Sequence, residues 1–202
     1  MDEKIFRIND VFWTVQGEGA NSGRRSLFIR LPFCNYNCSW CDTEYDTYKE
    51  WSTHDLIEFI SQETCRFVVV TGGEPLMNKQ LPDLIEFLKT HKFEIAVESN
   101  GSFPATPGID FITVSPKKYV QKGLPEFFIN PALIGKVQEY KYVVEEGFDF
   151  SILKRHEFDV CRLSLSPEFN NFKESCEKII NYIKENPRWR ISLQTHKWMQ
   201  IP

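Results

Sequence analysis

The sequence predicts an α/β protein whose parallel strands and crossover helices form a partial, incomplete TIM-like βα barrel. Two observations carry this prediction. Short β-rich apolar runs alternate with segments of helical periodicity along the chain. The chain has 202 residues, whereas a complete eightfold barrel takes about 250, so we expect about six or seven strands.

The alternation can be followed in chain order. The first strand is expected at residues 27–31, and a helix follows the capping sequence Ser52-Thr53-His54-Asp55. Further strands are expected at residues 66–71, 93–98, 110–115, 139–144, 160–165 and 190–194, with further helices around residues 81–88 and 172–183. In such a fold the chemistry is expected in the loops at the carboxyl ends of the strands.

Residues 1–202 are expected to form one domain, because the chain has no repeat, low-complexity tract or long Pro/Gly-rich linker. Apolar residues make up 42% and charged residues 26%, which is ordinary globular usage. The longest apolar run, residues 67–70, is far shorter than the ~20 residues of a membrane span. An acidic N-terminus without a following apolar segment predicts a cytoplasmic protein. The net charge of −4 gives no basic surface for direct nucleic-acid binding.

Three of the six cysteines, Cys34, Cys38 and Cys41, lie within eight residues of one another. In a reducing compartment so tight a cluster indicates metal binding or catalysis. The remaining cysteines, Cys65, Cys161 and Cys176, are expected to be small buried hydrophobic residues.

Zinc and iron–sulfur make different demands on the cysteine cluster. A structural zinc site closes its tetrahedron with a fourth Cys or His, and no second cysteine pair is present. A cubane held by three cysteines leaves one iron open to another ligand, which suits catalysis. We favour the cubane and keep a zinc-binding interaction module as the alternative.

The cysteine loop resembles the radical S-adenosylmethionine (SAM) superfamily, whose signature is C-x₃-C-x₂-C with an aromatic residue, here Trp40, before the last cysteine. The resemblance implies a [4Fe-4S] cluster on the three cysteines and SAM on its open iron. The run Thr71-Gly72-Gly73-Glu74-Pro75 matches the superfamily's Gly-Gly-Glu motif, in which Glu74 offers a carboxylate to the SAM ammonium. Two further strand ends resemble its ribose- and carboxylate-contacting segments. The cofactor-binding residues so implied are Trp40, Gly73, Glu74, Glu98, Ser115 and Lys117.

The flanking sequences resemble one family within this superfamily, 7-carboxy-7-deazaguanine synthase, of queuosine and 7-deazapurine biosynthesis. They are Gln16-Gly17-Glu18-Gly19, Cys41-Asp42-Thr43, and Gln194-Thr195-His196-Lys197 before Pro202. The resemblance implies a lyase that converts 6-carboxy-5,6,7,8-tetrahydropterin to 7-carboxy-7-deazaguanine with loss of ammonia. A 5′-deoxyadenosyl radical would abstract the C6 hydrogen, and SAM would be regenerated.

By the same resemblance, residues 12–24 form an N-terminal substrate segment and residues 194–202 a substrate-contacting tail that partly closes a lateral opening. Gln16 and Glu18 suit the amide and amino edge of a pterin, and Arg30 suits its carboxylate, with a plain interstrand ion pair as the alternative for Arg30. The other implied substrate contacts are Thr71, His196 and Pro202.

No catalytic side chain is implied beyond the cofactor chemistry. Thr43 matches a family position that helps to hold Mg²⁺. The resemblance also implies a homodimer and an electron donor such as flavodoxin or ferredoxin. Where many family members carry a Gln that seats SAM, this chain has Ser166. A radical SAM activase that acts on a protein glycyl residue is the alternative enzyme.

Overall fold

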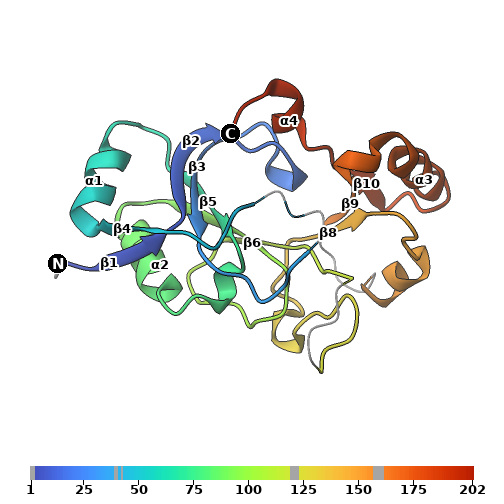
Figure 1. The fold of residues 1–202 in the computed structure, drawn as a ribbon, viewed down its shortest axis with the longest axis horizontal. Helices are drawn as coiled ribbons and strands as arrows, with labels where there is room; N and C mark the ends of the chain where they lie inside the picture. The colour runs from blue at the N-terminus through green and yellow to red at the C-terminus, as the bar shows by residue number, and fades with distance from the viewer. Residues whose placement is uncertain (1–2, 39–40, 42, 119–122, 157–161) are drawn as a thin grey trace.

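The computed structural model describes residues 3–38, 41, 43–118, 123–156 and 162–202. Eight strands form one curved sheet in the order β10-β9-β8-β7-β6-β5-β3-β2 (Figure 1). A separate two-stranded antiparallel sheet pairs β1 with β4. The strands are β1 (Ile5–Ile8), β2 (Asp10–Val15), β3 (Arg25–Leu31), β4 (Lys49–Ser52), β5 (Phe67–Gly72), β6 (Glu94–Ser99), β7 (Phe111–Val114), β8 (Glu139–Val144), β9 (Arg162–Pro167) and β10 (Trp189–Ile191).

All pairings in the large sheet are parallel except that of β2 with β3, which is antiparallel. The sheet is open, since β2 and β10 lie at opposite edges and do not pair. Both the α/β class and the incomplete barrel predicted from the sequence are therefore confirmed.

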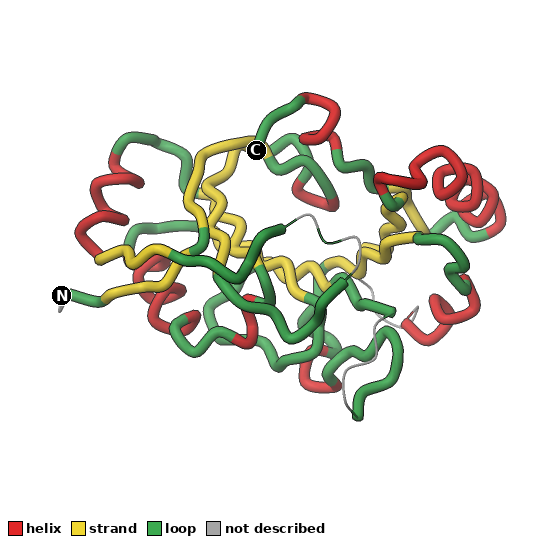
Figure 2. Tube along the Cα trace, in the orientation of Figure 1, coloured by secondary structure: helices red, strands yellow, loops and turns green. Residues whose placement is uncertain are grey.

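The helices are α1 (Thr53–Ser61), α2 (Leu81–Thr90), α3 (Phe172–Glu185) and α4 (Thr195–Met199). Ser52 caps α1 with a complete capping box, as predicted: its hydroxyl accepts from the Asp55 amide, and the Asp55 carboxylate accepts from the Ser52 amide. In Figure 2 the first three helices lie outside the sheet. Among the described residues, no helix is long and apolar enough to cross a membrane.

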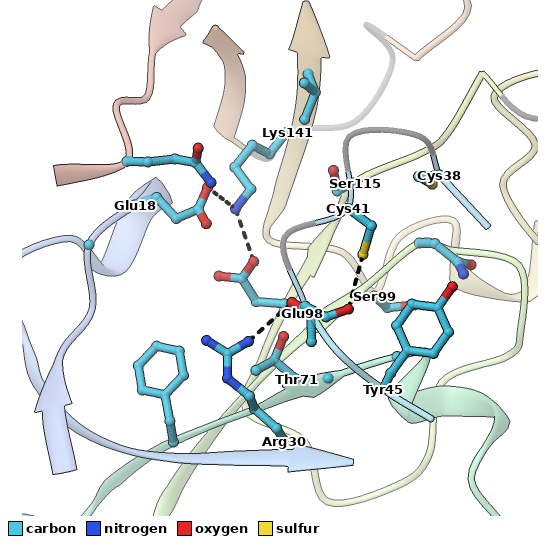
Figure 3. A pocket seen from close by; sticks show the side chains of 18 of the residues that line it. Glu18, Arg30, Cys38, Cys41, Tyr45, Thr71, Glu98, Ser99, Ser115 and Lys141 are labelled. Carbon is cyan, nitrogen blue, oxygen red and sulfur yellow. Dashed lines mark hydrogen bonds and ion pairs between the residues drawn. The ribbon is translucent and has the colours of Figure 1, made fainter. Parts of the chain in front are cut away.

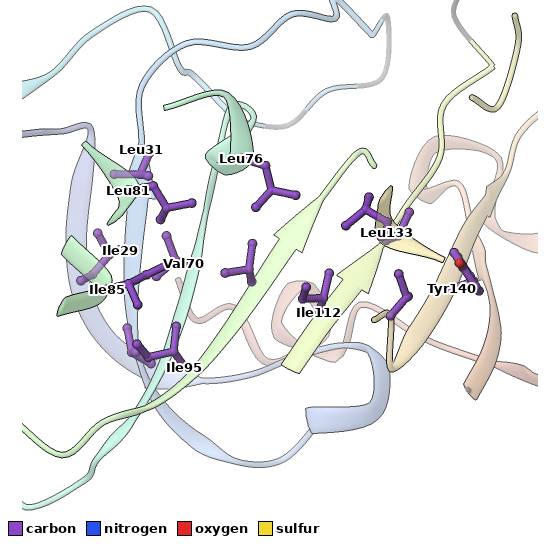
Figure 4. Close-up of a cluster of buried hydrophobic side chains, with 14 of the residues drawn as sticks. Ile29, Leu31, Val70, Leu76, Leu81, Ile85, Ile95, Ile112, Leu133 and Tyr140 are labelled. Atoms are coloured by element: carbon purple, nitrogen blue, oxygen red, sulfur yellow. The ribbon is translucent and has the colours of Figure 1, made fainter. Parts of the chain in front are cut away.

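The main core lies between the outer face of the sheet and the helices (Figure 4). Val68 and Val70 of β5 are fully buried in the same cluster as Leu84 and Leu88 of α2. β-branched residues suit a strand that is covered on both faces. This packing fixes the strands, and thereby the positions of the loops at their carboxyl ends.

The open side of the sheet is bridged by chain segments rather than by strand pairing. The amide and hydroxyl of Thr195 both donate to the Gly17 carbonyl, at 2.9 and 2.7 Å. The Thr14 hydroxyl donates to the Pro202 carbonyl at 3.1 Å. Figure 2 shows the C-terminal segment running from the β10 edge back to β2. The C-terminal tail is therefore tied by hydrogen bonds to β2 and to the segment that follows it.

The structure also departs from the sequence predictions. Strands β1, β2 and β4 were not expected, because runs of four to six residues with interspersed charges carry little periodicity. The strand expected at residues 190–194 ends at Ile191. Cys65, in the loop before β5, and Cys176, within α3, are half-buried rather than core residues, and Cys161 is outside the described residues.

Candidate active site

A cavity of about 360 Å³ opens at the carboxyl ends of the parallel strands (Figure 3). Residues two apart on a strand face the same side of a sheet, and this alternation sets the chemistry of the inner face. Val69 and Ala96, packed with Phe28, form an apolar floor. The next inward residues on the same strands are polar and line the cavity: Arg30, Thr71 and Glu98.

The cavity brings together most of the residues predicted from the sequence. Those lining it are Gln16, Glu18, Arg30, Cys34, Cys38, Cys41, Thr43, Thr71, Gly73, Glu98, Ser115, Lys117, His196 and Pro202. Trp40 lies outside the described residues. Ser166 is buried in β9 and does not line the cavity.

The cysteine loop is anchored at its start through Phe33 and Asn35. The Phe33 amide donates to the Tyr45 carbonyl, and the Phe33 carbonyl accepts from the Glu74 amide, both at 2.8 Å. The Asn35 amide group donates to the Ser102 hydroxyl at 2.9 Å and accepts from the Asn100 side chain at 2.8 Å. These contacts hold the loop against the ends of β5 and β6.

The three thiols on this loop face the cavity with different degrees of burial. Burial raises the pKa of Cys34, and it raises the pKa of Cys38 to about 11. No set of three His, Cys, Asp or Glu side chains in the described ranges is gathered for a single metal ion. A cubane takes each cysteine on a different iron, so three spaced thiols on one loop fit a cluster better than a lone ion.

Gly73 lets the backbone pass unusually close to the cysteine loop. A Cβ at this position would lie 1.9 Å from the Phe33 carbonyl oxygen and 2.9 Å from the Cys34 nitrogen. Both neighbours are backbone atoms, which cannot move aside as a flexible side chain can. Only glycine therefore fits where β5 meets the cysteine loop.

The position of Glu74 corrects the expectation that its carboxylate meets a ligand ammonium. Glu74 is fully buried and does not line the cavity. Its Oε1 accepts from the Leu76 amide at 2.9 Å and the Ser99 hydroxyl at 2.8 Å, and its Oε2 accepts from the Asn100 amide at 2.6 Å. Burial raises the pKa of Glu74 to about 6. The side chain joins the loops after β5 and β6.

Ser115 and Lys117 follow β7 on the same side of the cavity. The Lys117 ammonium donates to the Ser115 hydroxyl at 3.0 Å. Burial lowers the pKa of Lys117. Together with Ser99, which also lines this wall, they offer two hydroxyls and an ammonium group.

The opposite wall carries a connected set of charged side chains. Lys141 of β8 places its Nζ 2.8 Å from Glu18 Oε2 and 2.9 Å from Glu98 Oε2. Gln16 Nε2 donates to Glu98 Oε1 at 2.9 Å, and Gln16 Oε1 accepts from the Glu18 amide at 3.2 Å. Lys141 was not predicted. The sequence feature that could have indicated it is the pair Glu139 and Lys141, two residues apart in an otherwise apolar strand. Residues at this spacing lie on the same face of a sheet, so that face carries charge.

Arg30 extends over the cavity floor. Its Nη1 donates to the Thr43 hydroxyl at 3.2 Å, and its guanidinium lies 5.4 Å from the centre of the Phe12 ring. Among the described residues, Arg30 has no carboxylate partner within ion-pair distance, so the structure does not support the interstrand ion pair.

His196 packs against the N-terminal substrate segment. A Cβ at Gly17 would lie 2.2 Å from His196 Nδ1, so the absence of a side chain at Gly17 makes room for the histidine. The cavity is therefore completed by segments from both ends of the sequence.

Comparison with known families agrees with this geometry. Residues 28–119 match the model of the radical SAM superfamily, and this stretch contains the cysteine loop, Gly73 and Lys117. The match places residues 28–119 in the radical SAM class, whose members use a [4Fe-4S] cluster and SAM.

The particular family follows from relatives that match along the whole chain. A 7-carboxy-7-deazaguanine synthase of Haemophilus influenzae is 32% identical over 98% of this chain and 95% of its own. That of a Synechocystis species is 34% identical over 97% of this chain and 93% of its own. The crystal structure of QueE from Escherichia coli matches with a TM-score of 0.76 at 27% identity, over 94% of this chain and 93% of its own. This chain belongs to the 7-carboxy-7-deazaguanine synthase family.

Proposed function

We propose that this chain converts 6-carboxy-5,6,7,8-tetrahydropterin to 7-carboxy-7-deazaguanine with loss of ammonia. The observation that carries the proposal is the cavity itself, in which the cysteine loop faces a wall of paired amide, carboxylate and guanidinium groups. A pterin carries an amide and amino edge at one end and a carboxylate at the other, and this wall complements both.

The cofactor side holds the radical source. Cys34, Cys38 and Cys41 bind the cluster, while Ser115 and Lys117 offer polar groups to SAM. Trp40 is proposed to contact the cofactor, as the family signature implies. When bound, the reduced cluster and SAM supply a carbon-centred radical that takes a hydrogen atom from a substrate carbon. Gly73 keeps the backbone close enough for its peptide groups to meet SAM. Glu98 serves the SAM ribose from the boundary between the two sides.

The substrate side fixes the pterin. Gln16 and Glu18 receive its amide and amino edge, and Arg30 pairs with its carboxylate. Thr71 contacts the ring from β5, while His196 and Pro202 close the cavity from the tail. The protein contributes placement and exclusion of water, because the reacting carbon must sit beside the radical source and away from other hydrogen donors. Residues 12–24 and 194–202 are thus the two substrate segments of one domain.

Mg²⁺ is proposed at Thr43, whose hydroxyl lies beside the Arg30 guanidinium. This hard cation keeps several waters and takes substrate oxygens, so a single protein ligand suffices. Removal of Mg²⁺ with a chelator should lower turnover without releasing iron, and readdition should restore it.

The decisive assay uses anaerobically reconstituted protein with SAM, a chemical reductant and the pterin. We expect 7-carboxy-7-deazaguanine by mass spectrometry and no net consumption of SAM. Release of 5′-deoxyadenosine without a deazapurine would favour the glycyl-radical activase instead. A colourless protein with stoichiometric zinc would favour the zinc module.

The proposed partners are a one-electron donor of the flavodoxin or ferredoxin type and a second copy of the chain. Exposed aromatic residues support the second copy: Trp198 is 60% exposed and packs edge-on against Phe169, itself 41% exposed. Sedimentation of Trp198→Ser against the unmodified protein tests this surface. Because the three cluster thiols must stay reduced, we propose a cytoplasmic location.

A further inference from the structure

Strand β8 presents charged residues to the inside of the barrel at two levels. Glu139 and Lys141 are two residues apart, so both face inward, and they are 0% and 3% exposed. Figure 3 shows Lys141 reaching between Glu18, on the N-terminal segment, and Glu98, at the end of β6. Neither residue of β8 belongs to the sequence motifs that marked the site.

The lower level anchors the N-terminal segment. Glu139 Oε2 accepts from the Ala20 amide at 2.8 Å, and Glu139 Oε1 accepts from the Ser164 hydroxyl at 2.6 Å. The Gly19 amide donates to the Ser192 hydroxyl at 2.8 Å. These bonds fix the position of the N-terminal segment relative to β8 and so bring Glu18 within ion-pair distance of Lys141.

The upper level joins the two sides of the cavity. Glu18 is a substrate-side carboxylate, and Glu98 stands toward the cofactor. One ammonium lies within 3 Å of both (2.8 and 2.9 Å), and Gln16 closes the ring between them. A buried ammonium with two carboxylate partners has little freedom to move.

The charges explain why a cation is needed here. Burial raises the pKa of Glu98, the charge of Glu18 raises it further, and Lys141 opposes both effects. The two carboxylates in turn raise the pKa of Lys141 despite the opposing effect of its burial. Lys141 is therefore held as a cation, and its charge favours the ionised form of Glu98, which accepts its hydrogen bond.

We propose that Lys141 is a positioning residue that fixes the spacing between Glu18 and Glu98, and thereby sets how far a pterin held at its amino edge by Glu18 places its reacting carbon from the radical source. The inference rests on the proposed function. Lys141 itself does not react. It acts by holding Glu18 in place, so its loss should weaken pterin binding while leaving the cluster unchanged.

The test compares Lys141→Met and Lys141→Arg with the unmodified protein after reconstitution. Iron content, melting temperature, the Kd for 6-carboxy-5,6,7,8-tetrahydropterin by anaerobic calorimetry, and KM and kcat are measured for each. Removal of one member of a buried ion pair usually weakens binding strongly, so we expect a pterin Kd at least about tenfold higher for Lys141→Met. Iron content should not change, and KM should rise more than kcat falls.

Lys141→Arg separates position from charge. Arginine keeps the cation but spreads it over a wider planar group, which cannot reproduce a single ammonium between two carboxylates. We expect a melting temperature close to that of the unmodified protein and a pterin Kd raised about three- to tenfold. If Lys141→Met does not fold, the pterin Kd of Lys141→Arg tests the positioning role by itself. Normal pterin binding in Lys141→Arg would overturn the positioning role.

Lys178→Met is the matched control, since Lys178 forms an exposed i,i+4 pair with Glu174 on α3. Its Kd and KM should match those of the unmodified protein. If the unmodified protein makes product but Lys141→Met binds pterin normally, only this inference fails. If the unmodified protein neither binds nor converts the pterin, the proposed function and the inference both fail.

Discussion

The two walls of the cavity are built on different principles. On the proposed cofactor side, Gly73 and Ser115 follow the parallel strands β5 and β7, and Phe33 and Glu74 bond through their backbones. On the proposed substrate side, long charged side chains meet from distant segments, such as Glu18 before β3 and Lys141 of β8. The cofactor wall therefore depends on local chain geometry, whereas the substrate wall depends on the correct assembly of the whole barrel.

This difference predicts that damage to the cofactor wall abolishes the radical source, while damage to the substrate wall spares it. Substitutions in each wall can distinguish these effects. Iron content reports on the cofactor wall, and the Kd for the pterin reports on the substrate wall.

The largest effect is expected from Cys38→Ala. Removal of one of three thiolate ligands leaves the cluster without a full set, so iron content and the brown absorbance should be lost after reconstitution, together with all product. A variant that retains the cluster and turns over would contradict the assignment of Cys38 as a ligand.

Gly73→Ala should be nearly as severe, because the added methyl group would meet the Phe33 carbonyl and the Cys34 nitrogen. The cysteine loop must move, so we expect SAM affinity to fall by about 100-fold or more, or about 3 kcal/mol. Equilibrium dialysis of SAM under anaerobic conditions measures this. Gly123→Ala controls for backbone strain without a clash, since φ is +86° there and nothing lies within 4 Å of a Cβ; it should lower stability but leave SAM affinity normal.

Arg30→Ala tests the substrate wall. Loss of a charge-assisted pair with the pterin carboxylate should cost about 2–3 kcal/mol, or about 30- to 150-fold in kcat/KM, with iron content unchanged. Full activity in this variant would exclude the carboxylate role of Arg30.

Glu74 links the cofactor wall to pH. Its pKa in the folded chain is about 6, above the ordinary 4.5, so the folded state binds the proton more tightly than the unfolded state. Its contribution to stability is therefore present below pH 4.5 and is lost as pH rises through 6. From about pH 3.5 to pH 7 the free energy of unfolding of the cluster-free protein should fall by about 2 kcal/mol from this group. Denaturant titrations at several pH values in this range give the free energy of unfolding at each pH. For Glu74→Gln this free energy should depend less steeply on pH than for the unmodified protein. An unchanged pH dependence would contradict the raised pKa of Glu74.

The smallest effect is expected from Gly17→Ala, the substrate-side counterpart of Gly73→Ala. The added methyl group meets the His196 side chain, and the tail that carries it can shift. We expect less than about tenfold loss of pterin affinity, about 1 kcal/mol, and normal SAM binding. An equal loss of pterin affinity and SAM affinity would show that the two walls are not independent.

The same contrast explains what the sequence could predict. The cysteine spacing, the glycine turn and the alternation of elements are local features, and they indicated the class, the partial barrel and most of the cofactor wall. Lys141 became visible only when the strand register placed it between Glu18 and Glu98. Glu74 was misplaced because sequence spacing does not say whether a carboxylate points into a cavity or back into the loops.

The hydrogen bonds from Thr195 to Gly17 join positions 178 residues apart. Contacts of such long range form late in folding, because a large loop must close before they stabilise anything. We therefore expect the Thr195 amide to exchange its hydrogen with solvent faster than the amides of β5, since local opening of the tail does not require the sheet to unfold. While the tail is open, the cavity and the cysteine loop that lines it are exposed on that side of the sheet.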